Sequence, residues 1–198
     1  MTDIHPHQLS TPSAWVKRFA PLIQEGGAVL DLACGGGRHA RLLAGMGYSV
    51  DAVDRDEALL ANLQGIAGIS TLCADLEGGP WPYGGRVFSG IVVTNYLWRP
   101  LLPLLFASLD KGGVLIYETF MLGHERFGKP SNPAFLLRPN ELLDVVRSRL
   151  TVTAFEQGEV GAALAAESPG EVMMEPRPSA VQRICAQRGE VGLLPTLP

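Results

Sequence analysis

The chain has 198 residues, of which 46% are hydrophobic and 18% are charged, a composition that excludes extensive disorder and fits one domain with a continuous core. Lys and Arg total 16 against 20 Asp and Glu, giving a net charge of −4, which argues against a long nucleic acid as substrate because such a footprint is basic. The 3 widely spaced cysteines indicate neither a disulfide framework nor a zinc site.

The chain is divided into a predicted flexible arm over residues 1–10, a domain over 11–190 and a tail over 191–198. The arm is polar and lacks the regions of a signal peptide, and no apolar run approaches the roughly 20 residues of a membrane span. We therefore expect a cytoplasmic protein with reduced thiols.

The first half of the domain alternates short apolar runs with helical patterns. Thr11 or Ser13 can cap a first helix that runs through Gln24, with Trp15 on its apolar face. Asp56 can cap a later helix. The expected strands cover 28–32, 48–53, 69–74 and 87–94, and the expected helices between the first three cover 38–44 and 56–64.

The second half continues this alternation with a helix that begins near Pro100 and a strand over 114–118. Residues 120–138 have no clear period, which predicts a long functional loop. A helix to Arg149 follows, and then strands over 151–157 and 180–187, joined by a loop over 167–178. The pattern predicts a doubly wound α/β fold, a mostly parallel sheet with helices on both faces and an antiparallel strand at one edge.

Ligands of such sheets bind beyond the carboxyl ends of the strands, so the residues after each strand are the candidate site. Gly35 and Gly37 follow the first strand, where they permit a tight turn, and the next helix offers unpaired N–H groups to an anionic group. Asp31, four residues before Gly35, can orient a cationic amino group.

Two further carboxylates follow the second and third strands. Asp54 can accept hydrogen bonds from both hydroxyls of a ribose. Asp75 can accept from an adenine amino group, while the Leu76 N–H meets a ring nitrogen. Three carboxylates at successive strand ends suit a ligand with a sulfonium charge, such as S-adenosylmethionine (SAM). The run Gly35–Ala40 also fits the dinucleotide pattern Gly-x-Gly-x-x-Ala, which keeps an NAD-dependent oxidoreductase as an alternative.

Four segments in this order resemble motifs of the class I SAM-dependent methyltransferases. These are Val29–Ala40 (motif I), Val50–Asp54 (the acidic motif), Ala74–Leu76 (the adenine-side motif) and Leu109–Leu115 (the entry to strand five). The Gly-Arg-His-Ala run is most similar to the tellurite-resistance-like small-molecule branch. The resemblance implies a Rossmann-like seven-stranded sheet whose last strand is antiparallel.

The resemblance also implies roles for individual residues. Cofactor contacts are expected from Asp31, Ala33, Gly35 and Gly37 at the amino-acid end, Asp54 at the ribose, Asp75 and Leu76 at the adenine, and Asn95 after the fourth strand. Gly36 stands where a side chain is common. Asn95-Tyr96-Leu97 replaces the Asn-Pro-Pro-aromatic motif of nucleic-acid amino-methylating enzymes, which disfavours adenine or cytosine as acceptor.

The expected reaction is in-line transfer of the SAM methyl group to a small-molecule acceptor. Glu118, His39 and Tyr96 are the candidate bases, none with a decisive signature. Expected partners are the acceptor and a second copy of the chain, with no nucleic acid, membrane or metal. A non-catalytic SAM-binding sensor is the main alternative, and an RNA or protein methyltransferase would need a basic groove near residues 120–138.

Overall fold

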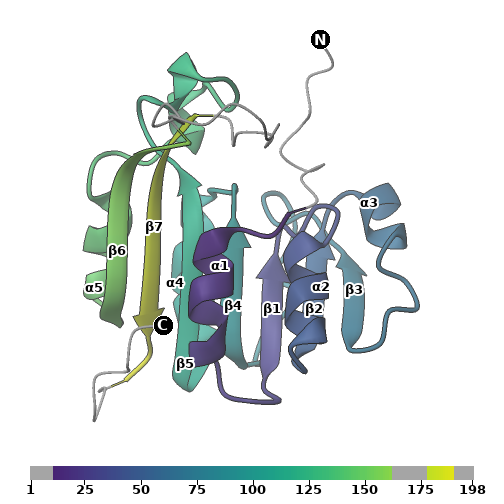
Figure 1. Cartoon of the computed structure of the whole chain (residues 1–198). Helices are drawn as coiled ribbons and strands as arrows, with labels where there is room; N and C mark the ends of the chain where they lie inside the picture. The colour runs from purple at the N-terminus through teal and green to yellow at the C-terminus, as the bar shows by residue number, and fades with distance from the viewer. Residues whose placement is uncertain (1–10, 162–177, 190–198) are drawn as a thin grey trace, which may run out of the picture.

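The computed structural model describes residues 11–161 and 178–189, which form one α/β unit around a seven-stranded sheet (Figure 1). The predicted arm, the predicted tail and nearly all of the predicted 167–178 connection lie outside the described residues. The strands are β1 (Ala28–Leu32), β2 (Ser49–Asp54), β3 (Ile69–Cys73), β4 (Phe88–Thr94), β5 (Leu109–Phe120), β6 (Thr151–Val160) and β7 (Ser179–Gln187).

The strand order is β3-β2-β1-β4-β5-β7-β6, with β7 antiparallel to both of its neighbours. β1 pairs in parallel with β2 on one side and β4 on the other, so that Asp31 lies opposite Ala52 and Val92. The strand order therefore reverses between β1 and β4, the place where doubly wound sheets bind ligands. The predicted doubly wound, mostly parallel sheet with an antiparallel last strand is confirmed.

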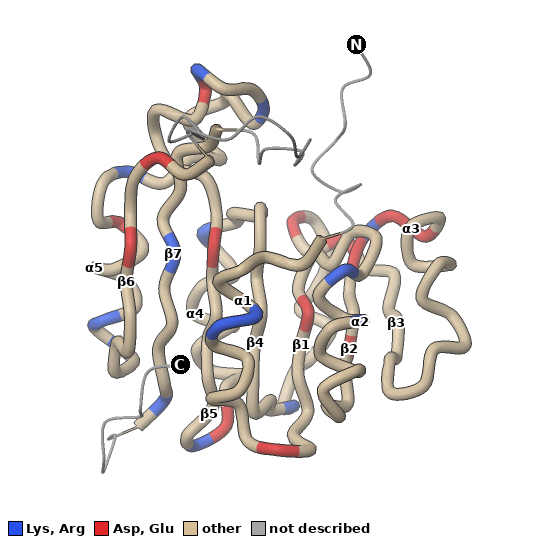
Figure 2. The backbone as a smooth tube through the Cα atoms, in the orientation of Figure 1, with Lys and Arg blue, Asp and Glu red and all other residues tan. Residues whose placement is uncertain are grey.

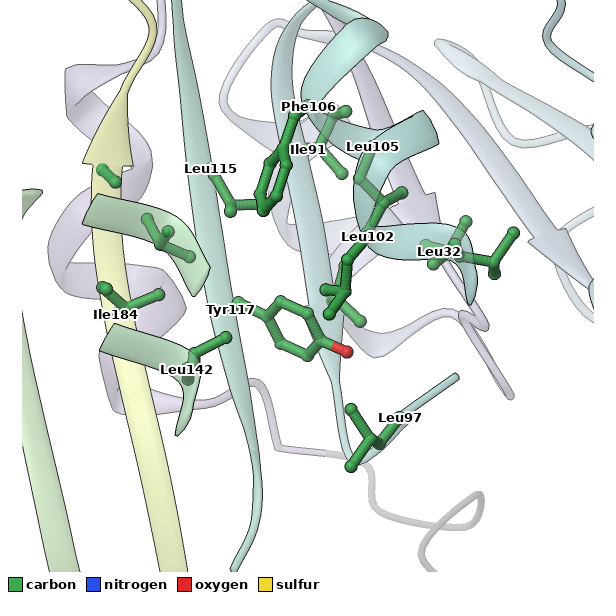
Figure 3. Packing of buried hydrophobic residues seen from close by; sticks show 14 of the residues in the cluster. Leu32, Ile91, Leu97, Leu102, Leu105, Phe106, Leu115, Tyr117, Leu142 and Ile184 are labelled. Carbon is green, nitrogen blue, oxygen red and sulfur yellow. The ribbon is translucent and has the colours of Figure 1, made fainter. Parts of the chain in front are cut away.

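Helices cover both faces of the sheet (Figure 1). They are α1 (Ala14–Phe19), α2 (Arg38–Gly45) and α3 (Glu57–Ala61) on one face, and α4 (Leu102–Ala107) and α5 (Glu141–Arg147) on the other. Each face has its own apolar core, which is expected when strands are buried on both sides. Figure 3 shows the second core, where Tyr117 of β5 lies among leucines from α4 and α5.

Several element boundaries differ from the sequence prediction. α1 ends at Phe19 and continues as a short 3-10 turn, Ala20–Leu22, instead of running to Gln24. Pro21 explains the difference, because it lacks the N–H needed to continue the α-helical ladder. Ser13 is the cap, since its hydroxyl accepts from the Trp15 N–H at 3.1 Å.

β5 is much longer than predicted, 12 residues from Leu109 to Phe120 instead of 114–118. Its pairing with β4 begins with a register shift, and its antiparallel pairing with β7 continues as far as Phe120. Pairing with a distant strand is a tertiary effect that local periodicity cannot reveal. The extension matters because it carries Thr119 and Phe120 to the site described below.

Candidate active site

A cavity of about 560 Å³ opens at the carboxyl ends of the strands. Its walls come from the turns after β1 to β4, from the end of β5 and from the segment over residues 120–138. The lining residues are Ala33, Asp54, Arg55, Asp56, Leu59, Ala74, Asp75, Leu76, Glu77, Asn95, Tyr96, Leu97, Thr119, Phe120, Lys129, Pro130, Ser131, Asn132 and Phe135.

The floor of the cavity is made where β1 and β4 end side by side. Ala33 and Asn95 lie directly after these strands, and both have left-handed backbones, with φ of 52° and 55°. Such conformations cost non-glycine residues about 1–3 kcal/mol and concentrate at functional sites. The Asn95 N–H donates to the Glu118 carbonyl at 2.9 Å, which fixes the turn against β5.

Asp54 ties the glycine turn to the end of β2. One carboxylate oxygen accepts from the Gly35 N–H at 2.8 Å and the other from the Asp56 N–H at 3.0 Å. The side chain is buried yet lines the cavity. Because each carboxylate oxygen has further acceptor capacity, Asp54 is held in place while it can still bind hydroxyl groups.

Asp75 lines the same side of the cavity after β3. It accepts from the Glu77 N–H at 3.0 Å, and the backbone N–H groups of Glu77 and Gly78 hold the pKa of its carboxyl below the ordinary value. Asp75 is exposed and stays ionised, with one oxygen directed to its own turn. Leu76 beside it is buried and contributes an apolar surface to the wall.

Asp31 lies next to the cavity, within β1, and does not line it. Its Oδ2 atom is buried and has no hydrogen-bond partner in the described chain. Burial raises the pKa of Asp31 to about 7, against the opposing effects of the Ala40 N–H and the Arg38 charge. A buried carboxylate with an unused oxygen is suited to a cationic ligand group.

The glycine turn after β1 also borders the cavity without lining it. Gly35 and Gly37 have left-handed backbones, with φ of 54° and 74°. A Cβ at Gly37 would lie 2.4 Å from a methyl carbon of Leu63, so a side chain there would require Leu63 to move and would also be strained by the left-handed backbone. The structure thus brings five predicted cofactor residues to the lining (Ala33, Asp54, Asp75, Leu76 and Asn95), whereas Asp31, Gly35 and Gly37 do not line the cavity.

Two of the candidate bases, His39 and Glu118, do not line the cavity. His39 is buried; its Nε2 accepts from the Ser13 N–H at 3.1 Å and its Nδ1 lies 3.3 Å from the Thr94 hydroxyl. Burial, together with Arg38, lowers the pKa of His39 to about 3, so the ring stays neutral and joins α1 to α2 and β4. Glu118 forms an ion pair with Arg183 at 3.5 Å.

Tyr96 is the one candidate base that the structure brings to the cavity. Its hydroxyl is buried and has no hydrogen-bond partner among the described residues. Burial raises the pKa of Tyr96 above its usual range, and the nearby carboxylates of Glu77 and Asp75 add to the rise. Tyr96 therefore keeps its proton at neutral pH and can donate a hydrogen bond.

Trp15 lies on α1, on the apolar face that the sequence predicts, and does not line the cavity. The structure buries it against the sheet, where the indole Nε1–H donates to the Ile184 carbonyl of β7 at 3.2 Å. The guanidinium of Arg183 lies 5.1 Å from its ring centre. Trp15 is therefore part of the core, as expected for an aromatic residue on an apolar helix face.

The segment over residues 120–138 forms the far wall and is anchored by Arg99, which the sequence analysis missed. The Arg99 guanidinium pairs with both oxygens of Glu141, at 2.6 and 3.0 Å. It also donates to the carbonyls of Ala134 (2.6 Å) and Leu136 (2.9 Å). These partners lie 35 to 42 residues along the chain, so no local pattern indicates them.

Glu141 completes this anchor, the Arg99 clasp. It also accepts from the Arg138 N–H at 2.8 Å. Although burial raises the pKa of Glu141, the hydrogen bonds from Arg99 and Arg138 lower it to about 2. The clasp is therefore charged at neutral pH and holds the far wall in a defined conformation.

One family model matches part of this sequence, and several solved structures share its fold. The family model for tellurite resistance protein TehB matches residues 9–76, which contain the glycine turn, Asp54 and Asp75. A comparison with curated proteins found no match. TehB from Haemophilus influenzae shares 20% identity and a TM-score of 0.69, over 90% of this chain and 63% of that one.

The chain has the fold of solved SAM-dependent methyltransferases, and part of its sequence matches the TehB family model. A TehB-like SAM-dependent methyltransferase from Corynebacterium glutamicum has 16% identity and a TM-score of 0.58, over 88% of this chain and 87% of that one. The N-methyltransferase NodS from Bradyrhizobium japonicum has 14% identity and a TM-score of 0.62, over 88% and 94%.

This fold agrees with the seven-stranded sheet that the sequence motifs led us to expect. The chain spans 63% of the length of the H. influenzae protein. Within the described ranges, no helix is long and apolar enough to cross a membrane.

Proposed function

We propose that the protein is a SAM-dependent methyltransferase that acts on a small-molecule acceptor in the cytoplasm. The observation that carries the proposal is the convergence of Asp54 and Asp75 with the strained turn at Ala33 on one cavity, at the point where strand order reverses. The sequence match to the TehB family covers the same residues, 9–76.

The residues of the cavity fit SAM at both ends of that molecule. The buried, unpartnered oxygen of Asp31 is suited to the amino group, and the N–H groups at the start of α2 are suited to the carboxylate. Asp54 is proposed to bind the ribose hydroxyls. Asp75 and the Leu76 N–H are proposed to bind the adenine, with Asn95 on the neighbouring strand end.

Methyl transfer from SAM depends more on the alignment of the methyl donor with the acceptor atom than on the transfer of a proton. SAM carries its methyl group on a positively charged sulfur, and the neutral thioether that remains after the transfer is a good leaving group. The chain's contribution is to hold donor and acceptor in line and to exclude water, and such positioning contributes about 7–11 kcal/mol in favourable cases. Tyr96 can donate a hydrogen bond within the cavity but keeps its own proton, so we do not assign it as a base.

Calorimetric titration of the purified protein with SAM, S-adenosylhomocysteine (SAH) and NAD tests the proposal. We expect saturable binding of SAM and SAH and none of NAD. If folded protein binds neither SAM nor SAH, the proposed function is wrong, and binding of NAD in their place supports the oxidoreductase instead. Binding of SAM without turnover of any acceptor supports the sensor.

A further inference from the structure

The two halves of the cavity differ in charge. All four acidic lining residues lie on the cofactor half, after β2 and β3 (Asp54, Asp56, Asp75 and Glu77). The far half comprises Leu97, Thr119, Phe120 and the segment over residues 120–138, and among its described lining residues there is no carboxylate. Figure 2 shows acidic residues beside α3, and both basic and acidic residues in the loops beyond the end of β5.

Lys129 is the only charged group among the described lining residues of the far half. No carboxylate of the described chain lies within ion-pair distance of its amino group, although most arginines of the structure have one. A cation that lines a cavity without an internal partner is suited to an anionic ligand.

The backbone of Lys129 is nevertheless held firmly. The ring of His124 is buried, and its Nε2 lies 3.1 Å from the Lys129 carbonyl. The same ring stacks on Phe120, a lining residue, with 3.9 Å between ring centres. Lys129 is exposed at the cavity lining; its backbone is anchored, and its amino group has no ion-pair partner among the described residues, so it is available to an anionic ligand.

Phe135 provides an apolar surface on the same wall. The residue is 37% exposed and lines the cavity. Its two neighbours, Ala134 and Leu136, are each held by a hydrogen bond from Arg99 to their carbonyl oxygen. An exposed aromatic ring on a clamped backbone is suited to contact with an apolar ligand body. Phe120 and Leu97 extend this surface toward the cavity floor.

From these observations we infer that the acceptor is a small acid on an apolar, aromatic-sized body, bound with its anionic group near Lys129 and its body against Phe135. This inference rests on the proposed function. The acceptor anion donates its electron pair to the methyl carbon, and the carbon–sulfur bond breaks with its pair going to sulfur. Both charges are neutralised and no proton is removed, which explains why the far half needs no base.

The test uses the intact protein saturated with SAH and two probes of similar size and opposite charge, benzoate and benzylamine, with binding followed by ligand-observed NMR titration. We expect benzoate to bind at least about fivefold more tightly than benzylamine. Lys129→Gln is expected to weaken benzoate binding about tenfold, the loss of one charge-assisted hydrogen bond. Lys129→Arg should stay within about twofold.

Two further variants separate recognition from general effects. Phe135→Ala should weaken both probes about equally, because both have the phenyl body. Arg126→Gln is the matched control: it removes a cation from the same segment, but Arg126 is 60% exposed, pairs with Glu159 and does not line the cavity. We expect no change in benzoate binding from this control.

A turnover assay extends the test to chemistry, with SAH release measured for thiophenol and for benzylamine. Methylation of thiophenol in preference to benzylamine supports the inference. Preference for benzylamine, equal effects of Lys129→Gln and Arg126→Gln, or no binding of either probe at millimolar concentration overturns it. Failure of the protein to bind SAH at the outset contradicts the proposed function itself, so the two failures are distinguishable.

Discussion

The cofactor half and the far half of the cavity are built in different ways. In the cofactor half, the carboxylates of Asp75 and Asp56 accept hydrogen bonds from backbone N–H groups two or three residues further along the chain. The Asp54 carboxylate accepts from the Asp56 N–H, two residues away, and from the Gly35 N–H. In the far half, Arg99 reaches residues at least 35 positions distant. The first is a set of short motifs placed by the sheet, whereas the second exists only after folding.

This difference predicts that the halves can be damaged separately. A change in the cofactor half should alter SAM affinity with a smaller effect on the far wall. A change in the clasp should loosen the far wall and leave SAM affinity almost intact. The predictions below test that separation, from the largest expected effect to the smallest.

Asp54→Ala should have the largest effect on ligand binding. It removes the proposed ribose acceptor and the acceptor of the Gly35 N–H, so we expect SAH affinity to fall about 100-fold, or about 2.7 kcal/mol. Calorimetry measures the affinity, and thermal unfolding measures the fold. Asp54→Asn keeps an acceptor for Gly35 and should unfold more like the parent. Unchanged SAH affinity in Asp54→Ala would show that the cofactor is placed wrongly.

Arg99→Gln should lower the free energy of unfolding by about 2 kcal/mol, because it leaves the Glu141 carboxylate, whose side chain is only 9% exposed, without its main partner. Hydrogen exchange over residues 128–138 should accelerate, while SAH affinity changes less than about threefold. The matched control is Arg147→Gln, which breaks an exposed pair with Asp144 and should cost less than about 0.5 kcal/mol. Equal exchange in the two variants contradicts the clasp.

The stability difference between the parent and Arg99→Gln should depend on pH. The pKa of Glu141 falls from an ordinary 4.5 to about 2 in the folded protein, so the unfolded chain takes up its proton first. The contribution of the Arg99–Glu141 pair to the free energy of unfolding is therefore complete above pH 4.5 and disappears as the pH falls toward 2. Chemical denaturation at several pH values measures the difference, and a difference that grows on acidification contradicts this linkage.

Asp31→Asn should stabilise the ligand-free protein by about 1–2 kcal/mol at pH 8, because it removes a buried charge of which one oxygen, Oδ2, has no hydrogen-bond partner among the described residues. The pKa of Asp31 rises from 3.8 to about 7 on folding, so the folded protein retains a proton that the unfolded chain has lost. The contribution of Asp31 to the free energy of unfolding is therefore largest below pH 3.8 and is lost as the pH rises to about 7. The gain in melting temperature should therefore shrink on acidification, and SAM affinity should fall at every pH.

Trp15→Phe should have the smallest effect. It removes the hydrogen bond to the Ile184 carbonyl but keeps an aromatic ring in the core, so we expect a loss of about 1 kcal/mol in unfolding free energy. SAH affinity should not change, because Trp15 does not line the cavity. A marked loss of SAH affinity would show instead that α1 contributes to cofactor binding.

The sequence by itself determined the doubly wound fold, the strand-end placement of Asp54 and Asp75, and the Asp56 cap, because short-range periodicity and turn chemistry encode these features. Tertiary structure decided the rest. His39 became a buried link between helices, β5 grew through pairing with β7, and Arg99 fixed a wall distant in sequence. Each of these features depends on contacts between segments that are distant in sequence, and the local sequence pattern does not specify such contacts.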